Sequence, residues 1–313
     1  MTRVAVASRS FSKNIFLRER LISIYPDCKF NDSGEKLEGE SLVNFLSGCD
    51  KAITALEEIN EKVLSKLPDL KVIGKYGVGL DMIDLAAMDK YSVKLGWTPG
   101  VNKNSVAELV VATAIGLSHR IFFSNYEVRS SNWYQVQGRE LNNLTIGIIG
   151  CGNIGKQVVK FLQPFGCKII SHDILDLSDF YNLYNVEAAT LQDLLKQSDI
   201  VTLHLPLDKT TKNILNSENL YLLKDGSMII NFARGGLIDE VELKKILSQE
   251  NGISSAALDV FEVEPPQDQE LVNLPNVFVT PHIGGSTEEA IIAMGLAAIE
   301  GLNNARVATT FKL

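Results

Sequence analysis

The chain has 313 residues, of which 45% are hydrophobic and 22% charged, as in soluble globular proteins long enough for two domains. Its net charge of -8 and its lack of a Lys/Arg cluster argue against a nucleic-acid partner. No stretch reaches the ~18 apolar residues of a membrane span, and the apolar run near Met1 is too short for a signal peptide. We therefore expect a cytoplasmic protein with no nucleic-acid or membrane partner.

The cysteines and histidines show no pattern of metal ligation. The four histidines are widely scattered, and the cysteines have no C-x-x-C spacing. We therefore expect no metal and four buried free thiols, which are Cys28, Cys49, Cys151 and Cys167.

Through the first hundred residues, short apolar runs alternate with helical patterns. The strands are expected at 4–7, 29–30, 51–54, 70–74 and 93–95. The helices are expected at 15–24, 41–46, 60–67 and 82–90. This alternation predicts a parallel sheet covered by helices on both faces.

The stretch 97–100 (Trp-Thr-Pro-Gly) interrupts this alternation and predicts a crossing between domains. A long helix is expected from Ser105 to Val128, and its nearly continuous apolar content predicts burial against a large surface. Trp133 and Tyr134 then lie in a polar loop.

The alternation resumes at Ile146, and a second break, with Pro281 and Gly284-Gly285, precedes a last amphipathic helix. Further strands are expected at 168–171, 200–203, 227–230, 256–258 and 277–279, and helices at 156–162, 191–197, 239–248 and 287–302. The pattern predicts an α/β protein in which a Rossmann dinucleotide-binding domain, 101–282, is inserted into a flavodoxin-like parallel α/β domain made of 1–100 and 283–313. We expect a ligand cleft between these domains.

A glycine turn after the strand at Ile146 predicts the dinucleotide site. Gly150, Gly152 and Gly155 fit G-x-G-x-x-G between a β-branched run and a helix, and Asp173 ends the next strand, 18 residues further on. In such a motif the helix N-terminus binds a pyrophosphate and the acid binds the adenosine ribose. An α/β turn without a ligand is the alternative, and the combination of strand, helix and acid disfavours it.

Three later strands are each followed by a polar side chain suited to oxo-acid chemistry. Arg234, Asp259 with Glu264, and His282 all follow strands of the same domain. Ligands bind at the carboxyl ends of such strands, where an arginine can hold a carboxylate and a histidine can exchange a proton. Each residue alone also has a structural explanation, namely a surface ion pair, a loop cap or a packed histidine.

The ordered motifs resemble those of the D-isomer-specific 2-hydroxyacid dehydrogenases, and most closely those of the phosphoglycerate dehydrogenase branch. They are the glycine turn, His204-x-Pro206-Leu207-x-x-x-Thr211, Asn231-x-Ala233-Arg234-Gly235, Asp259-Val260-Phe261-x-x-Glu264-Pro265 and Pro281-His282-Ile283-Gly284-Gly285. The resemblance extends over nearly the whole chain, including 77–81 and 99–109.

The resemblance implies a catalytic role for three side chains. His282 would donate the proton to the substrate carbonyl, and Glu264 would pair with it and raise its pKa. Arg234 would bind the substrate carboxylate and polarise the carbonyl, while the backbone N–H groups of Val78 and Gly79 would bind the other side of that carboxylate.

The resemblance also implies NAD as the cofactor. The implied cofactor-binding residues are Gly150, Gly152, Asn153, Ile154, Gly155, Asp173, Pro206, Thr211, Phe232, Ala233, Arg234, Asp259, His282 and Gly284. Asp173 would repel the 2′-phosphate of NADP, and the following Ile174 and Leu175 offer no compensating charge.

The substrate is less determined than the reaction. Phosphoglycerate dehydrogenases present arginines to the phosphate just after the strand that matches 51–54, whereas here 54–58 holds no arginine and two acids. Lys75 is a possible source of charge, and the end at Leu313 leads us to expect no regulatory extension and no serine feedback through one. Glyoxylate, hydroxypyruvate or another small 2-oxo acid is therefore as plausible as 3-phosphohydroxypyruvate.

The sequence allows two alternative functions, and a homodimer is expected. One is an S-specific dehydrogenase, which the order of the motifs disfavours. The other is an NAD-sensing binding protein like the C-terminal binding protein corepressors, which share this fold. The family resemblance further implies a homodimer formed through the dinucleotide domain.

Overall fold

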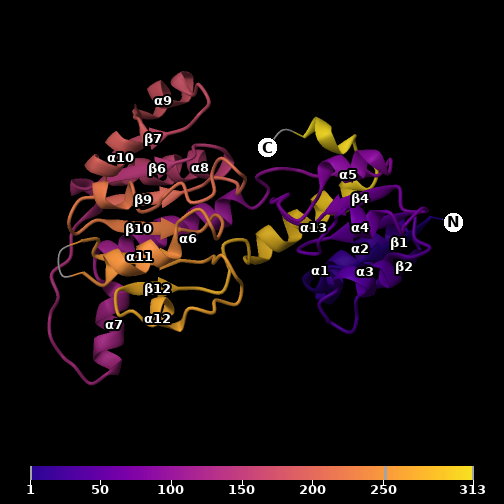
Figure 1. Cartoon of the computed structure of the whole chain (residues 1–313), viewed down its shortest axis with the longest axis horizontal. Helices are drawn as coiled ribbons and strands as arrows, with labels where there is room; N and C mark the ends of the chain where they lie inside the picture. The colour runs from indigo at the N-terminus through magenta and orange to yellow at the C-terminus, as the bar shows by residue number, and fades with distance from the viewer. Residues whose placement is uncertain (1, 250–251, 312–313) are drawn as a thin grey trace. The chain divides into compact units, whose positions relative to one another are not determined.

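The structure is a computed structural model that describes residues 2–249 and 252–311. The chain forms two compact units: the first contains residues 1–102 and 286–313, and the second contains residues 103–285. The boundaries lie within three residues of the expected crossings. In Figure 1 the second unit is the magenta-to-orange part of the chain, and the first unit combines the indigo and yellow parts.

The first unit is built on a five-stranded parallel sheet with the order β2-β1-β3-β4-β5. The strands are β1 (Arg3–Val6), β2 (Asp27–Phe30), β3 (Lys51–Thr54), β4 (Val72–Lys75) and β5 (Lys94–Gly96). This is the flavodoxin-like order that the sequence predicts. Because Thr54 pairs with Lys75, the segments that follow β3 and β4, which are expected to determine substrate specificity, leave the same edge of this sheet.

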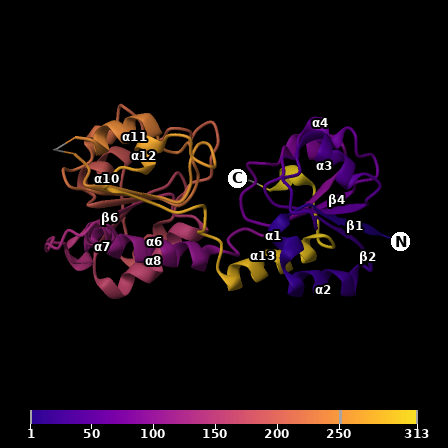
Figure 2. The ribbon, with the colours of Figure 1, turned by 90° about the horizontal axis from the view of Figure 1, so that it is seen from below.

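Helices cover both faces of this sheet. They are α1 (Arg9–Lys13), α2 (Ile15–Ile24), α3 (Gly39–Leu46), α4 (Glu61–Leu64), α5 (Leu85–Lys90), α13 (Glu288–Gly301) and the 3-10 turn η4 (Ala308–Thr310). Figure 2 shows α3 and α4 on one face and α2 and α13 on the other. A β-carbon at Gly74 would lie 2.4 Å from the Ala298 carbonyl oxygen, so this glycine lets α13 approach the sheet closely.

Two helices of the first unit are shorter than expected. The segment 60–67 is helical only in α4, and the segment 82–90 only in α5. Asp84 caps α5 by accepting a hydrogen bond from the Ala87 amide, and its own extended backbone ends the helical geometry there.

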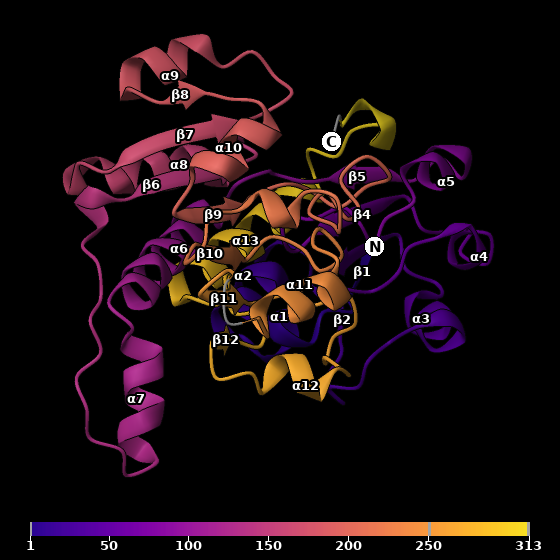
Figure 3. The same cartoon turned by 60° about the vertical axis from the view of Figure 1, so that its left-hand side comes forward.

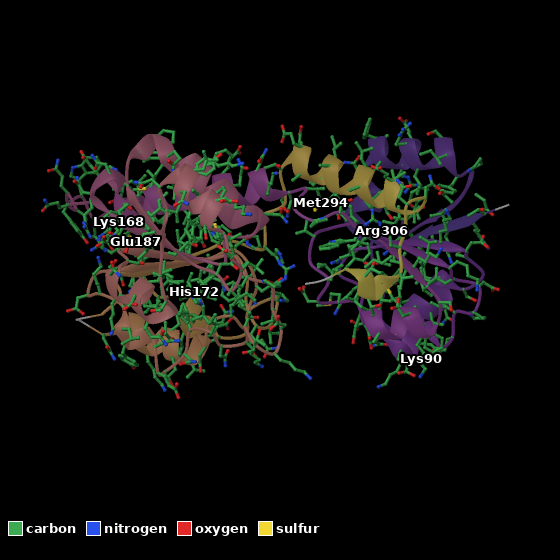
Figure 4. All side chains as sticks on the ribbon, turned by 90° about the horizontal axis from the view of Figure 1, so that it is seen from above. Lys90, Lys168, His172, Glu187, Met294 and Arg306 are labelled. Atoms are coloured by element: carbon green, nitrogen blue, oxygen red, sulfur yellow. The ribbon has the colours of Figure 1, made fainter. Side chains whose placement is uncertain are left out.

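The second unit contains a seven-stranded parallel sheet with the order β12-β11-β10-β9-β6-β7-β8. The strands are β6 (Thr145–Ile149), β7 (Lys168–His172), β8 (Glu187–Ala188), β9 (Ile200–Leu203), β10 (Met228–Asn231), β11 (Ser255–Leu258) and β12 (Val277–Val279). The order reverses between β6 and β9, as in a Rossmann domain, so the fold prediction is confirmed. The two-residue edge strand β8 escaped prediction, and the Lys168–Glu187 ion pair, 2.8 Å, links it to β7 (Figure 4).

The sheet of the second unit also has helices on both faces. They are α6 (Lys103–Ser118), α7 (Ile121–Arg129), α8 (Asn153–Leu162), α9 (Ser178–Tyr184), α10 (Leu191–Gln197), α11 (Glu240–Leu247) and α12 (Gln269–Val272), with 3-10 turns at Leu141–Asn143, Gln163–Phe165 and Leu220–Leu222. Figure 2 shows α6 and α8 on one face and α10 and α11 on the other.

The expectation of one buried helix from Ser105 to Val128 is wrong. The chain breaks after α6, where Arg120 has a φ of +59°, and α7 leaves at an angle of 64°. More than half of α6 is buried, whereas α7 has no buried residue and stands apart from its sheet in Figure 3. Among the residues described, no single helix is long and apolar enough to cross a membrane; α6 and α7 meet that criterion only as this bent pair.

The four cysteines are free thiols, as expected. Cys49 and Cys151 are buried, but Cys28 and Cys167 are only half-buried, so the expectation of four buried side chains is wrong for these two.

Candidate active site

The glycine turn joins β6 to α8, and two of its glycines are required by packing. Gly150 has a φ of +88°, and a β-carbon there would lie 2.9 Å from the His204 carbonyl oxygen. A β-carbon at Gly155 would lie 2.3 Å from the Gly150 carbonyl oxygen. Both positions exclude a side chain because helix, turn and strand pack against one another. Burial raises the pKa of the enclosed Cys151 thiol to about 11, which makes it a poor nucleophile.

Gly152 differs from its two neighbours because a β-carbon there would meet no atom within 4 Å. The next two amides, of Asn153 and Ile154, begin α8 and donate to no backbone acceptor among the described residues. Open space at Gly152 together with N–H groups that begin a helix suits a pyrophosphate. The turn therefore fits a dinucleotide.

Asp173 directly follows β7 and lies beside this turn. One carboxylate oxygen accepts the Cys151 amide at 2.7 Å and the other accepts the Leu175 amide at 2.9 Å. Each oxygen keeps a lone pair for a ribose hydroxyl. A pocket of about 720 Å³ adjoins it, and its lining includes the further acids Glu187 and Asp193.

The loop after β9 carries the remaining motif residues. The Thr211 hydroxyl donates to the Pro206 carbonyl at 2.8 Å and accepts the Asp208 amide at 2.8 Å, which fixes the loop. Burial lowers the pKa of His204 to about 3, so this imidazole is neutral. Its Nε2 lies 3.1 Å from the Thr202 hydroxyl, and its Nδ1 has no partner within the described part of the chain.

Arg234 follows β10 in a turn held by Asn231. The Asn231 side chain donates to the Arg234 carbonyl at 2.8 Å and accepts the Ala233 amide at 3.2 Å. One nitrogen of the Arg234 guanidinium donates to the Ala233 carbonyl at 2.7 Å. Phe232 and Ala233 are 4% and 7% exposed, so their side chains belong to the core.

His282 and Glu264 form a hydrogen-bonded pair. The His282 Nδ1 lies 2.8 Å from a Glu264 oxygen, and both side chains are more than a third exposed. The hydrogen bond that His282 donates to the Glu264 carboxylate raises the pKa of His282 above its usual value. Burial acts to raise the pKa of Glu264, but the hydrogen bond and charge of His282, the Phe261 amide and the charge of Arg234 together outweigh burial, so that pKa is lowered. The pair therefore favours imidazolium beside carboxylate, with Nε2 left to face a ligand.

Asp259 holds the turn that carries His282. It is 1% exposed and accepts hydrogen bonds from the Thr280 hydroxyl at 2.5 Å and from the amides of Ile283 and Gly284, each at 2.7 Å. His282 lies between these donors with a φ of +55°, a conformation that few histidines adopt. The carboxylate is thus engaged with protein donors, and Thr280 is a site residue that the sequence interpretation missed. Its only signal is a hydroxyl directly before Pro-His.

A pocket of about 360 Å³ opens beside this group. Its lining residues are Asp259, Phe261, Glu264, Pro265, Pro266, Val279, Thr280, Pro281 and His282. The mainly apolar wall beside an imidazole–carboxylate pair suits a flat ring and a small polar reactant. No group of residues suited to a metal ion occurs in the described part of the chain.

In the first unit, the turn after β4 presents two amides that donate no backbone hydrogen bond within the described ranges. They belong to Val78 and Gly79, which are half-buried. Lys75 is 4% exposed and donates to the Ala55 carbonyl. Glu57 turns back to accept the Ala55 amide at 2.6 Å.

The second unit combines a doubly wound sheet with an open glycine cradle, and an imidazole–carboxylate pair and an arginine follow its strands. This combination defines an NAD-dependent oxidoreductase. The comparisons with known proteins make the class specific. Residues 111–284 match the model of the D-isomer specific 2-hydroxyacid dehydrogenase NAD binding domain. The chain belongs to the D-isomer-specific 2-hydroxyacid dehydrogenase family.

Individual relatives carry different names. The chain is 36% identical to a hydroxypyruvate reductase of Thermotoga maritima over 279 residues, 86% of this chain and 88% of that protein. It is 39% identical to a D-3-phosphoglycerate dehydrogenase of Bacillus subtilis over 241 residues, 76% of this chain but only 46% of that longer protein. Its structure resembles that of an Aquifex aeolicus D-lactate dehydrogenase complexed with NAD and lactic acid, with a TM-score of 0.84, 27% identity and coverage of 96% and 93%.

Proposed function

We propose that this protein reduces a small 2-oxo acid to its D-2-hydroxy acid, with His282 as the proton donor. The observation that carries the proposal is the 2.8 Å His282–Glu264 pair, which leaves Nε2 free beside a pocket in the unit that holds the glycine cradle. The same pair serves the reverse reaction when the imidazole is neutral.

Each residue has one task in this mechanism. Arg234 binds the substrate carboxylate and polarises the 2-oxo group, and the amides of Val78 and Gly79 bind the other side of the carboxylate. The His282 Nε2–H donates its proton to the carbonyl oxygen as charge develops there, while Glu264 stabilises the imidazolium. Bound NADH supplies the hydride for C2 of the substrate.

The open cradle and the acidic pocket also support the assignment of NAD to particular residues. We assign the pyrophosphate to the amides of Asn153 and Ile154 and the adenosine ribose to Asp173. Glu187 and Asp193 in the pocket beside Asp173 add to the repulsion of a 2′-phosphate. A lower kcat/KM with NADPH than with NADH is the expected result.

For the substrate, we propose an unphosphorylated acid such as hydroxypyruvate or glyoxylate. The segment after β3 offers the acids Glu57 and Glu58 where a phosphate would need a cation. Hydroxypyruvate is also the substrate in the name of the Thermotoga relative, which the chain matches over most of its length. Higher kcat/KM for 3-phosphohydroxypyruvate would contradict this choice without affecting the reaction class.

The decisive experiment is NADH oxidation with a panel of 2-oxo acids, phosphorylated and not, for the wild type and His282→Ala. We expect the wild type to turn over at least one 2-oxo acid. In His282→Ala the kcat should fall about a hundredfold or more, because general acid catalysis contributes this much to the rate. Chiral analysis should give the D product. NADH binding without turnover of any acid would instead indicate an NAD-sensing binding protein, and undiminished turnover in the variant would refute the proton donor.

We also propose a homodimer formed through the second unit. Helix α7 and the following loop expose large apolar side chains, with Tyr126 57%, Trp133 86% and Tyr134 54% exposed. A helix with no residue buried in its own unit and several exposed aromatic side chains beside it is typical of an interface.

A further inference from the structure

The turn expected to bind the substrate carboxylate is itself held by a tryptophan. Trp97 directly follows β5, and its indole Nε1–H donates to the Val78 carbonyl at 3.0 Å. β5 pairs with β4 in parallel, so the two strands deliver Trp97 and Val78 to the same edge of the first unit's sheet. The indole also packs against the core of this unit.

This hydrogen bond fixes the direction of the next amide. A trans peptide is planar, so its C=O and its N–H point in opposite directions. Among the described residues the cis peptide bond is the one between Glu264 and Pro265, so the Val78–Gly79 peptide is trans. With the Val78 carbonyl turned to the indole, the Gly79 N–H must point away from the indole and its supporting core.

The indole is in turn fixed by the last described residues of the chain. The Phe311 and Trp97 rings meet edge to face, with centroids 5.4 Å apart and planes at 89°. The segment before it is bound to β5 by reciprocal backbone hydrogen bonds between Leu95 and Arg306, 2.8 and 3.0 Å; Figure 4 labels Arg306 in the yellow C-terminal part of the first unit. Asp89 accepts the Ala308 amide at 2.8 Å and so anchors the same segment.

We propose that Trp97 is a positioning residue that orients the Val78–Gly79 peptide so that the Gly79 N–H binds the substrate carboxylate. The inference rests on the proposed reduction of 2-oxo acids. Without the indole N–H the Val78 carbonyl loses its fixed partner, the peptide plane rotates more freely, and binding of the carboxylate must then order it.

The test is Trp97→Phe, which keeps an aromatic ring but removes the donor, against Trp133→Phe, which changes the exposed tryptophan of the other unit. We expect the KM for hydroxypyruvate or glyoxylate to rise about five- to tenfold in Trp97→Phe, the effect of one hydrogen bond. The kcat should stay within about twofold, because the substitution weakens binding of the carboxylate equally in the ground state and in the transition state. The Kd for NADH should not change, because the substitution affects binding of the carboxylate alone. Trp133→Phe should match the wild type.

Steady-state results separate this inference from the function on which it rests. A wild type that reduces no 2-oxo acid contradicts the proposed function. An active wild type with a Trp97→Phe variant of unchanged KM, or with a loss confined to kcat, contradicts the role of Trp97 alone. A purely structural role predicts a lower melting temperature with the same KM.

A second measurement does not depend on folding of the Trp97→Phe variant. In Trp133→Phe, Trp97 is the remaining tryptophan, and oxamate is an unreactive analogue of a 2-oxo acid. With NADH bound, oxamate at a concentration that inhibits NADH oxidation should shift or quench the Trp97 emission relative to the NADH complex, because its carboxylate binds the peptide held by the indole. Unchanged emission under these conditions would overturn the proposal.

Discussion

At the scale of single residues, the charge of His282 depends on its neighbours. The hydrogen bond to Glu264 raises the pKa of His282 and burial lowers it, while the charge of Arg234 lowers it and the charge of Asp259 raises it. Because reduction requires the imidazolium, kcat/KM for reduction should persist below the raised pKa and fall as the pH rises through it.

Glu264→Gln should move this fall to lower pH, because the neutral amide no longer stabilises the imidazolium. We expect a shift of about one pH unit together with a lower kcat near neutral pH. The control is Glu262→Gln, which changes a neighbouring acid on the same loop. The pH profiles of kcat/KM for both variants and the wild type measure the shift. A profile for Glu264→Gln that superimposes on the wild type would contradict the pair.

The Thr280 hydroxyl provides a second prediction for single residues. Thr280→Val keeps the shape of the side chain but removes the donor to Asp259, so the turn that holds His282 at a φ of +55° loses one of its three fixed points. We expect kcat to fall about tenfold or more, with recovery in Thr280→Ser and an unchanged Kd for NADH. Equal activity of the valine and serine variants would show that the hydroxyl is dispensable.

At the scale of elements, the glycine turn contains a matched pair of positions. Gly155→Ala places a methyl group 2.3 Å from the Gly150 carbonyl and should destabilise the protein by about 1–3 kcal/mol. Gly152→Ala meets no protein atom, so its melting temperature should equal that of the wild type while its Kd for NADH rises. Thermal melts and NADH titration of both variants measure this contrast, and a stable Gly152→Ala protein with wild-type NADH affinity would contradict the cradle.

The elements also show what the sequence can predict. Strands such as β9 (Ile200–Leu203) are predicted to the residue, because a buried parallel strand is a short apolar run bounded by polar residues. The break between α6 and α7 is not predicted by the sequence, because the apolar content continues through Ile121 and only tertiary packing determines which part is buried. The roles of Thr280 and Trp97 are also not predicted by the sequence, because their hydrogen-bond partners are distant in the chain and lie in other turns.

At the scale of the whole molecule, the exposed apolar side chains around α7 predict an assembly. Sedimentation of the wild type should give a dimer. Tyr126→Ser with Trp133→Ser should weaken it, because large aromatic side chains supply most of the binding energy of such interfaces. Ile15→Ser, which changes a side chain 72% exposed in the first unit, is the matched control. A monomeric wild type would remove the assembly from the proposal.

Each of the two units holds one tryptophan. Trp97 lies in the first unit, half-buried, and Trp133 lies in the second, 86% exposed. The chain crosses between the units at only two points, near residues 102 and 286. A denaturant titration of Trp133→Phe that records the Trp97 emission therefore follows the first unit, while far-UV circular dichroism of the same samples follows both halves of the molecule. Coincident midpoints would mean that the inserted half and its host unfold as one cooperative body, and separate midpoints would rank the two halves by their own stability.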